Sequence, residues 1–375
     1  MHANLTIART IEQGYFVFTL MPSLTCELNC PHCYLSLEQR RSHTRMSLTD
    51  LQIACERIAE YYQARRLPRK TIVCYWYGGE PTSVGQDYFT HACDIINAVF
   101  AKHLGYTVRH TVLSALIGVD TSWYPLFAKY CGSEIQSSFD WLMRGRGYLR
   151  KWEAAVTAVR AHGLTLSTIS VVNRTMLDVG ATFILDYLAD QNVAQASFLP
   201  FMWNEQNDNG AYGSFAPTMR EYSAFMRELT CRQEGRLQSG MHAPIIGQRE
   251  FILQKSYEGR LGNIAGQTLF LLPNGDFALP DYRQGCQEYL RPFGNILREP
   301  FEQILTSHER RAYLRKQMLQ ADNPECRGCA YSDCCLMEFW KTNRPGDDCF
   351  GARDYVSWLL ARSAGTSNYR EMVIY

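Results

Sequence analysis

The chain has 375 residues, of which 46% are hydrophobic and 20% charged, and this composition excludes a disordered chain, a coiled coil and a disulfide-stabilised miniprotein. Its 38 Lys and Arg residues balance 37 Asp and Glu residues, so the net charge of +1 provides no general attraction for nucleic acid or anionic lipid. No run approaches the roughly 20 apolar residues of a membrane-spanning helix, and the N-terminal sequence lacks the pattern of a signal peptide. We therefore expect a soluble cytoplasmic protein with no membrane and no nucleic-acid partner.

From about residue 15 to 200, β-branched and aromatic runs alternate with longer amphipathic stretches, as in βα units around a parallel sheet. Ser47 is placed to cap one helix, and a second is expected over Lys151 to His162, closed by Gly163. Six βα units in this length predict an α/β fold, a partial (β/α)6 barrel of the TIM type. The expected strands are Tyr15 to Met21, Thr71 to Tyr77, Tyr106 to Ser114, Glu134 to Phe139, Leu164 to Val171 and Ala194 to Phe201.

A polar stretch rich in Gly and Asn follows Phe201 and predicts a loop, and Pro217 to Arg236 is expected to be helical. The apolar runs on either side of Asn274-Gly275 predict a β-hairpin. We therefore expect two domains, a barrel over residues 1–235 and a small cysteine-rich domain with a β-hairpin over residues 236–375.

Fourteen cysteines are present, and in a reducing cytosol clustered cysteines indicate metal ligation or catalysis rather than disulfides. Those that stand alone are expected to be small buried hydrophobic residues: Cys55, Cys74, Cys93, Cys131 and Cys231. The remaining nine form an N-terminal group, a C-terminal group and the separate Cys286.

The N-terminal group is Cys26-Glu-Leu-Asn-Cys30-Pro-His-Cys33, directly after the first expected strand. Three thiolates on one loop can hold three irons of a four-iron cluster and leave the fourth iron open for a substrate or cofactor. A zinc site is the alternative, but it would need His32 or a distant residue as fourth ligand.

This CxxxCxxC loop resembles the motif of the radical S-adenosylmethionine (SAM) enzymes. The second strand is followed by Gly78-Gly79-Glu80-Pro81, which is similar to the GGEP motif with which that family binds the amino group of its cofactor. Two glycines allow a backbone to approach a ligand closely, and Glu80 offers an acceptor. The resemblance implies that Cys26, Cys30 and Cys33 are the cluster ligands.

The end of the fourth expected strand, Ser137-Ser138-Phe139-Asp140, resembles the family's serine-plus-aspartate strand end, which implies that Ser138 contacts SAM. Relatives often continue with a glycine and an arginine about a dozen residues on. Here Trp141 replaces the glycine, and the arginine role is left open between Arg144, Arg146 and Arg150.

Two further features belong to the same resemblance. Tyr34 and His32, on the cluster loop, are placed to pack near the adenine of SAM. The third strand also departs from the family, because Leu113-Ser114-Ala115-Leu116 stands where many relatives carry Thr-Asn-Gly.

The C-terminal group has five cysteines, from Cys326 to Cys349 inclusive. Their spacing resembles the C-terminal SPASM extension of peptide-modifying radical enzymes. The resemblance implies an auxiliary 4Fe-4S cluster held by Cys326, Cys329, Cys335 and Cys349. A complete extension of this kind holds two auxiliary clusters, but the further ligand positions around Pro280-Asp281, Glu299 and Phe339 carry no cysteine, so we expect two clusters in total. Cys334 can replace Cys335, and Cys286 can join Cys326 and Cys329 in the related one-cluster twitch arrangement. A four-cysteine zinc site is the other alternative.

If the resemblance holds, the protein is an oxidoreductase that reductively cleaves SAM to a 5′-deoxyadenosyl radical. We expect this radical to abstract hydrogen from a residue of a ribosomally synthesised peptide (RiPP maturation), with a reductant such as flavodoxin or ferredoxin. The alternatives are a radical dehydrogenase or epimerase of a small molecule and, from another class, a zinc-binding interaction protein.

Overall fold

The computed structural model describes residues 16–67, 71–258, 268–280, 290–319, 328–331, 334–335 and 346–363. In this part of the chain ten strands form one sheet, in the order β10-β9-β8-β1-β2-β3-β4-β5-β6-β7. Neighbouring strands from β1 to β7 are parallel, as are β1 and β8, whereas β9 is antiparallel to both β8 and β10. The strands are β1 (Phe16–Leu20), β2 (Thr71–Trp76), β3 (Thr107–Ser114), β4 (Glu134–Ser138), β5 (Thr165–Val171), β6 (Gln195–Leu199), β7 (Ile245–Ile246), β8 (Thr268–Leu271), β9 (Asp276–Pro280) and β10 (Leu290–Asn295).

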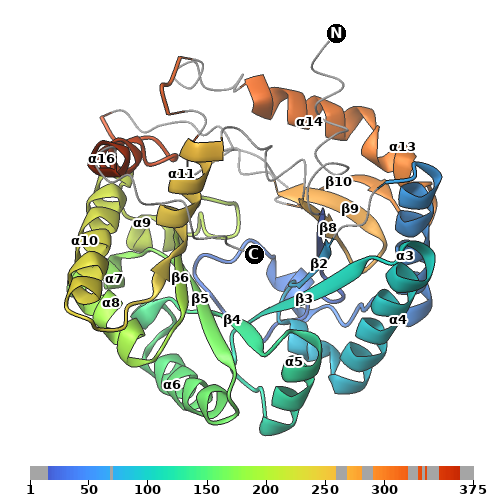
Figure 1. The fold of residues 1–375 in the computed structure, drawn as a ribbon, viewed down its shortest axis with the longest axis horizontal. Coiled ribbons are helices and arrows are strands. Elements are labelled where there is room, and N and C mark those ends of the chain that lie inside the picture. The colour runs from blue at the N-terminus through green and yellow to red at the C-terminus, as the bar shows by residue number, and fades with distance from the viewer. Residues whose placement is uncertain are drawn as a thin grey trace.

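The sheet curves into an incomplete barrel with its helices on the outer side (Figure 1). All six predicted strands are present within two residues of their expected ends, and the hairpin around Asn274-Gly275 is formed by β8 and β9. The predicted partial barrel is therefore confirmed, and the sheet does not close on itself because β7 and β10 are its two edges.

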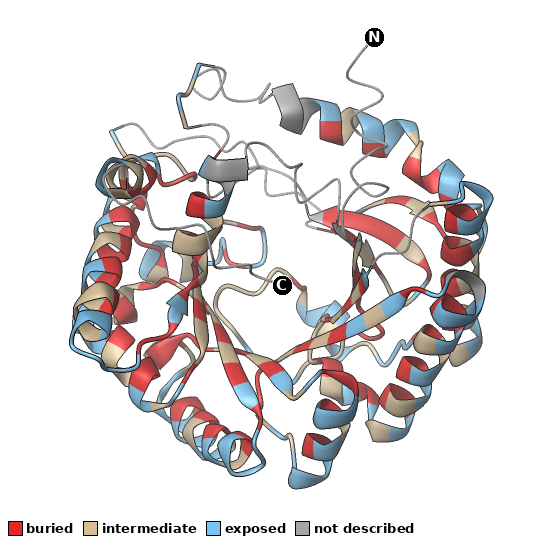
Figure 2. Cartoon of the chain, in the orientation of Figure 1, coloured by how far each residue is buried: buried red, intermediate tan, exposed pale blue. Residues whose placement is uncertain are grey.

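The helices have their buried faces toward the sheet and their exposed faces outward (Figure 2). In α3, for example, Ser47 accepts a hydrogen bond from Asp50 N as N-cap, and Leu51, Cys55 and Ile58 are buried. The other helices are α2 (Leu37–Arg41), α4 (Gln86–Leu104), α5 (Tyr124–Tyr130), α6 (Arg146–Ala161), α7 (Arg174–Val179), α8 (Ala181–Asp190), α9 (Ala211–Phe215), α10 (Met219–Gln238), α11 (Gly247–Glu258), α13 (Phe301–Leu305), α14 (His308–Leu319) and α16 (Arg353–Ser363), and α3 itself is Leu48–Ala64.

Two helices differ from the expectation at their ends. The helix expected from Lys151 begins at Arg146, because Gly145 (φ 86°) separates it from a short 3-10 turn, η3 (Trp141–Arg144). The helix expected from Pro217 begins at Met219, where Thr218 and Glu221 form a capping box.

Residues beyond 235 contribute strands to both edges of the same sheet, since β7 pairs with β6 and β8 pairs with β1. The division into domains at residue 235 stays a prediction. No helix in the described ranges is both long and apolar enough to span a membrane.

Four of the five isolated cysteines are buried in the core, as expected: Cys55, Cys74, Cys93 and Cys131. The expectation was wrong for Cys231, which is exposed on α10. Its neighbours on the helix alternate in burial with the helical period, and position 231 falls on the outer face.

Candidate functional site

The sequence motifs meet at one edge of the sheet. Because β1 to β6 are parallel, the segments that follow them emerge on the same side, as in other barrels where this edge carries the site. The cysteine loop follows β1, the Gly-Gly-Glu turn follows β2, and the Ser138 to Asp140 segment ends β4.

The cysteine loop is held in place by hydrogen bonds within the loop and to α2. Cys26 N donates to Arg40 O at 3.0 Å, and Cys33 N donates to Cys30 O at 3.1 Å. The Arg40 guanidinium also donates to Leu28 O at 2.7 Å. These contacts fix the backbone between the three thiols, all of which are half-buried.

Burial raises the pKa of all three thiols, that of Cys30 to about 12, so a bare thiolate is unfavourable here and a bound metal would stabilise it. In the part of the chain that the structure describes, no three His, Cys, Asp or Glu side chains are arranged as ligands of a single metal ion. A four-iron cluster needs no such convergence, because each thiolate binds its own iron. The loop therefore fits a cluster in which each of the three thiolates binds its own iron.

The Gly-Gly-Glu turn packs directly on the backbone that leads into the cysteine loop. Glu80 N donates to Thr25 O at 2.9 Å. A Cβ atom at Gly79 would lie 2.3 Å from both Leu24 O and Thr25 O, and one at Gly78 (φ 127°) would lie 2.5 Å from Ser23 O. Only glycine fits this approach, so the two motifs are one structural unit.

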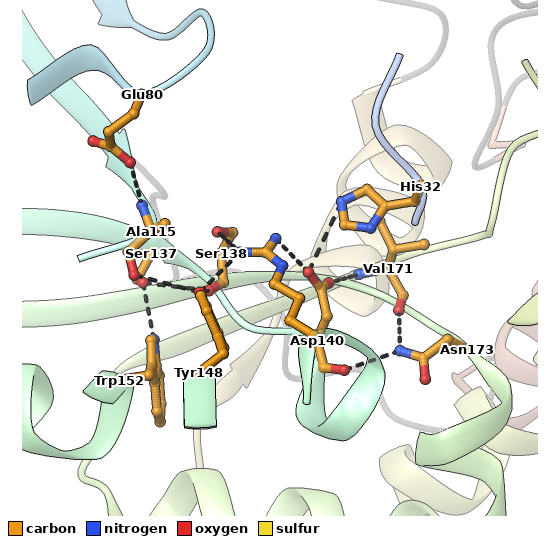
Figure 3. A network of polar contacts seen from close by, with 11 residues as sticks. His32, Glu80, Ala115, Ser137, Ser138, Asp140, Tyr148, Trp152, Val171 and Asn173 are labelled. Carbon is orange, nitrogen blue, oxygen red and sulfur yellow. Dashed lines mark hydrogen bonds and ion pairs between the residues drawn. The ribbon is translucent and has the colours of Figure 1, made fainter. Parts of the chain in front are cut away.

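The Glu80 carboxylate reaches from β2 toward the end of β3 (Figure 3). Its Oε2 accepts from Ala115 N at 2.9 Å, and its Oε1 accepts from Thr82 N at 3.2 Å and Thr82 Oγ1 at 2.8 Å. Burial raises the pKa of Glu80, although these hydrogen bonds offset part of the effect. The carboxylate is thereby oriented by the protein, with lone pairs left to accept a further donor.

The structure shows where the three candidate arginines lie. Arg144 is buried and forms an ion pair with Asp140, whereas Arg146 and Arg150 are exposed. Arg144 Nη1 also donates to Ser138 Oγ at 2.9 Å and to the Tyr148 hydroxyl at 2.8 Å. The structure thus brings Ser138 and Arg144 together and places the other two arginines apart from them.

Asp140 connects this cluster of polar side chains with two other strand ends (Figure 3). Its Oδ1 accepts from Val171 N at 2.9 Å, and His32 Nε2 of the cysteine loop lies 3.8 Å from its Oδ2. Asn173 Nδ2 donates to Asp140 O at 3.2 Å. Burial lowers the pKa of His32 to about 4, so its imidazole is neutral at pH 7.

Trp141 and Leu116 lie in the two segments where the sequence departs from the expected motifs, and both have a backbone conformation that glycine adopts easily. Trp141 has φ 51° and Leu116 has φ 62°, both in the left-handed region. The Trp141 ring packs edge-on against Phe183 and Tyr187, with centroids at 5.2 and 5.1 Å. Packing therefore supports a conformation that the residue type disfavours.

Tyr34 lies beside an aromatic column that runs along β2. Its ring stacks on Tyr77 at 6.3 Å between centroids, and Tyr77 stacks on Tyr75 at 5.9 Å. Phe270 of β8 meets the Tyr77 ring edge-on at 6.4 Å. These aromatic rings therefore connect the cysteine loop, which carries Tyr34, with β8, which carries Phe270.

Two of the C-terminal cysteines also come together. A Cβ atom at Gly351 would lie 2.2 Å from Cys335 Sγ and 3.6 Å from Cys349 Sγ, so both sulfur atoms border this glycine. Cys329 is half-buried, and Cys334 is buried in the hydrophobic core. Cys326 and Cys286 lie outside the described residues.

Buried polar atoms beside the cysteine loop bear on which kind of cofactor the residues fit. Among the described residues, Arg144 Nε and His32 Nδ1 are buried without a hydrogen-bond partner. Buried donors and acceptors are normally satisfied, so a polar ligand with a carboxylate would suit this position. The residues present therefore fit a cofactor that presents a carboxylate group beside the three cysteines.

Sequence reasoning missed Asn173, Tyr148 and Ala115, which orient Asp140, Arg144 and Glu80. Asn173 was recognisable as an N-cap, since it accepts from Thr175 N at 3.0 Å at the start of α7. No local pattern marks Ala115 or Tyr148. Ala115 N donates to Glu80, 35 residues away, and the Tyr148 hydroxyl donates to Ala115 O, 33 residues away.

Comparison with known proteins finds a family model and several solved structures. Residues 263–330 match the SPASM model, an iron-sulfur cluster-binding domain. Native anSMEcpe with bound AdoMet is similar over 93% of this chain and 99% of that chain, with a TM-score of 0.71 and 15% identity. Native anSMEcpe with bound AdoMet and the Cp18Cys peptide gives a TM-score of 0.70 with 14% identity over 94% of this chain and 99% of that chain.

Streptococcus suis SuiB bound to the precursor peptide SuiA is more distant. It has a TM-score of 0.55 and 13% identity over 86% of this chain and 71% of that chain. At these identities the likeness establishes the fold, a partial barrel with a C-terminal extension that these structures share with the chain.

Proposed function

We propose that this chain, which has the radical SAM fold with a SPASM segment at residues 263–330, cleaves SAM reductively and abstracts hydrogen from a residue of a ribosomally synthesised peptide. The observation that carries the proposal is the meeting of three motifs at one sheet edge: the cysteine loop, the Gly-Gly-Glu turn packed on it, and the hydrogen-bonded side chains of Ser138 and Arg144. Such a hydrogen abstraction would begin a crosslink or another modification of the peptide.

Each site residue receives a role from its surroundings. Cys26, Cys30 and Cys33 would hold the catalytic 4Fe-4S cluster, and Glu80 would accept from the amino group of SAM, because its carboxylate is already fixed by Ala115 and Thr82. Arg144 would bind the carboxylate of SAM, since it is the one buried arginine of the three candidates.

Further contacts to the cofactor would come from the same strand ends. Ser138 would contact the ribose or carboxylate through its hydroxyl, and Tyr34, Gly78 and Gly79 would line the space beside the cluster loop. When bound, the cluster and SAM supply one-electron cleavage of the sulfonium to methionine and a 5′-deoxyadenosyl radical. The protein's part is to exclude water and to hold the target carbon near the radical.

The peptide substrate is supported by two observations. Two structures of the same fold are complexes with peptides, Cp18Cys in anSMEcpe and the precursor peptide SuiA in SuiB. In this chain Leu199 is 42% exposed at the carboxyl end of β6, and Val171 ends the adjacent β5, which offers apolar contact to a substrate side chain. A radical dehydrogenase or epimerase of a small molecule remains the second candidate, and no specific contact favours it.

The same proposal includes two 4Fe-4S clusters, a barrel over residues 1–235 and an auxiliary domain over residues 236–375. The auxiliary cluster would use Cys326, Cys329, Cys335 and Cys349, of which Cys335 and Cys349 border Gly351. A cytoplasmic oxidoreductase of this kind needs a one-electron donor, and we propose a flavodoxin or ferredoxin.

The test begins with iron and acid-labile sulfide measured after anaerobic purification, followed by incubation with SAM and dithionite. We expect about eight irons per chain and release of 5′-deoxyadenosine. A variant with Cys26, Cys30 and Cys33 changed to alanine should keep about four irons and release none. Zinc in place of iron in both proteins would overturn the radical reaction and favour the zinc-binding interaction protein.

The substrate class is tested separately. Short peptides encoded beside this gene are incubated with the reduced enzyme and SAM, and their mass is followed. A peptide-dependent mass change supports the peptide substrate, whereas turnover of small sugars or nucleosides alone would support the second candidate.

A further inference from the structure

The segment that leads into Cys349 is hydrogen-bonded to the N-terminus of α10, which lies more than 100 residues earlier in the chain. Asp347 Oδ2 accepts from Met219 N, and its Oδ1 accepts from Arg220 N, both at 2.9 Å. The first backbone N–H groups of a helix have no partner inside the helix, and a carboxylate also interacts favourably with the helix dipole there. Asp347 therefore caps α10 from a distant part of the sequence.

Asp348 makes a second, buried connection. It is 3% exposed, and its Oδ2 accepts from Ser223 Oγ of α10 at 2.7 Å and from Asp354 N of α16 at 3.0 Å. Its Oδ1 accepts from Cys349 N at 2.8 Å. A buried carboxylate is tolerated only when it is well hydrogen-bonded, and these three donors provide that. One side chain thus links α10, α16 and the backbone of Cys349.

The backbone of Cys349 is also held at the beginning of α16. Ala352 N donates to Cys349 O at 2.8 Å. The backbone N–H groups of Arg353 and Gly351 also approach the Cys349 thiol. Backbone N–H groups directed at a thiolate stabilise it and tune the potential of a cluster that it binds.

The first turns of α10, which bind Asp347 and Asp348, are also linked to the sheet edge that carries the cysteine loop. Glu221 accepts from Thr218 N at 2.8 Å and pairs with both terminal nitrogens of Arg174, at 2.7 and 3.0 Å. Arg174 follows Asn173, whose side-chain amide donates to Asp140 O. Polar contacts, joined by the Asn173–Arg174 backbone and the first turns of α10, therefore connect Asp140, beside the cysteine loop, with Cys349.

We infer that Asp347 and Asp348 are positioning residues that seat Cys349, and with it the auxiliary iron-sulfur centre, on the helix end that is joined to the SAM site. The inference rests on the proposed function, because it assigns Cys349 to an iron ligand. It goes further by stating how the second centre is held at a fixed place relative to the first.

The test isolates the C-terminal centre by using the variant with Cys26, Cys30 and Cys33 changed to alanine as background. In this background, Asp348→Ala should remove about four irons per chain. The matched control is Asp354→Ala, which removes a carboxylate from the same turn but leaves the Asp354 backbone contacts with Asp348 and Arg227 in place. The control should keep its iron.

A second variant covers the case in which Asp348→Ala does not fold. Asp348→Asn keeps an acceptor for Cys349 N but carries no negative charge, so the iron should remain and the reduction potential of the centre should rise. A less negative surrounding favours the reduced, more negative cluster. A role in folding alone would leave the potential and the electron paramagnetic resonance spectrum unchanged.

The measurements distinguish an error in the auxiliary ligand set from an error in the positioning role of Asp348. If the background protein holds no iron while the wild type holds about four, the auxiliary ligand set in the proposed function is wrong. If the background holds about four irons, and both Asp348 variants keep them with an unchanged spectrum and potential, the positioning role is wrong.

Discussion

Asp140 and Arg144 form an ion pair inside the barrel, where their side chains are only 1% and 6% exposed. Arg144 is held from its other side by Ser138 and Tyr148, so the guanidinium cannot turn toward solvent. A buried charge pair of this kind is a poor source of stability, but it fixes the direction of a cation. In the proposed function that cation faces the carboxylate of SAM.

Replacement of Arg144 should separate binding from stability. Arg144→Gln should weaken SAM binding at least tenfold and destabilise the fold by about 3–5 kcal/mol, because Asp140 is left as an unpaired buried charge. Adding Asp140→Asn should recover most of the stability but none of the binding. Anaerobic calorimetry and thermal unfolding measure the two effects, with exposed Arg150→Gln as the control that should change neither.

Gly79→Ala should disrupt the cysteine loop. The added methyl would lie 2.3 Å from two carbonyl oxygens of the segment before Cys26, so the turn or the loop must move. We expect loss of about four irons per chain together with the loss of SAM cleavage. Gly147→Ala is the control, because the space at this α6 position is open and alanine favours a helix by up to about 1 kcal/mol. Full iron in the Gly79 variant would contradict the coupling of the two motifs.

The Arg174–Glu221 pair should give the protein a measurable pH dependence. The hydrogen bond from Arg174 lowers the pKa of Glu221 from its ordinary value of 4.5 to about 2, so the pair stabilises the fold above pH 4.5 and loses this contribution as the pH falls to about 2. Both side chains are more than a third exposed, which limits the effect to about 1 kcal/mol or less.

Urea unfolding of Glu221→Gln at several pH values tests this. The variant should be less stable than the wild type at pH 7, and the difference should disappear near pH 2. The exposed Glu60→Gln is the control, and an equal pH dependence in both variants would contradict a specific role of the pair.

The adjacent cysteines 334 and 335 should differ in function. Cys335→Ser should lose the auxiliary centre, about four irons per chain, because the Cys335 sulfur borders Gly351 together with Cys349. Cys334→Ala should keep all its iron, since Cys334 is packed in the hydrophobic core. Iron analysis of the two variants decides between them, and the reverse result would assign the ligand to Cys334.

Much of the fold could be predicted from local patterns. The strands were found because their β-branched and aromatic runs repeat between amphipathic stretches, and the hairpin was found because Asn274-Gly275 suits a tight turn. Helix ends were less accurate: α6 begins five residues before the expected position, since its start depends on Gly145 after an irregular turn. The exposed Cys231 was missed because composition does not tell which helix face is covered.

The sequence alone determined which residues make up the proposed cluster loop and the turn beside it, since Cys26, Cys30 and Cys33 and the Gly78-Gly79-Glu80 turn are each contiguous features of the chain. Only the tertiary structure decided which arginine lies beside Ser138, which of two adjacent cysteines meets Cys349, and that Asp347 caps a helix 128 residues away. Contacts of this kind depend on how whole elements pack, and packing is set by the summed burial of many side chains rather than by any short segment.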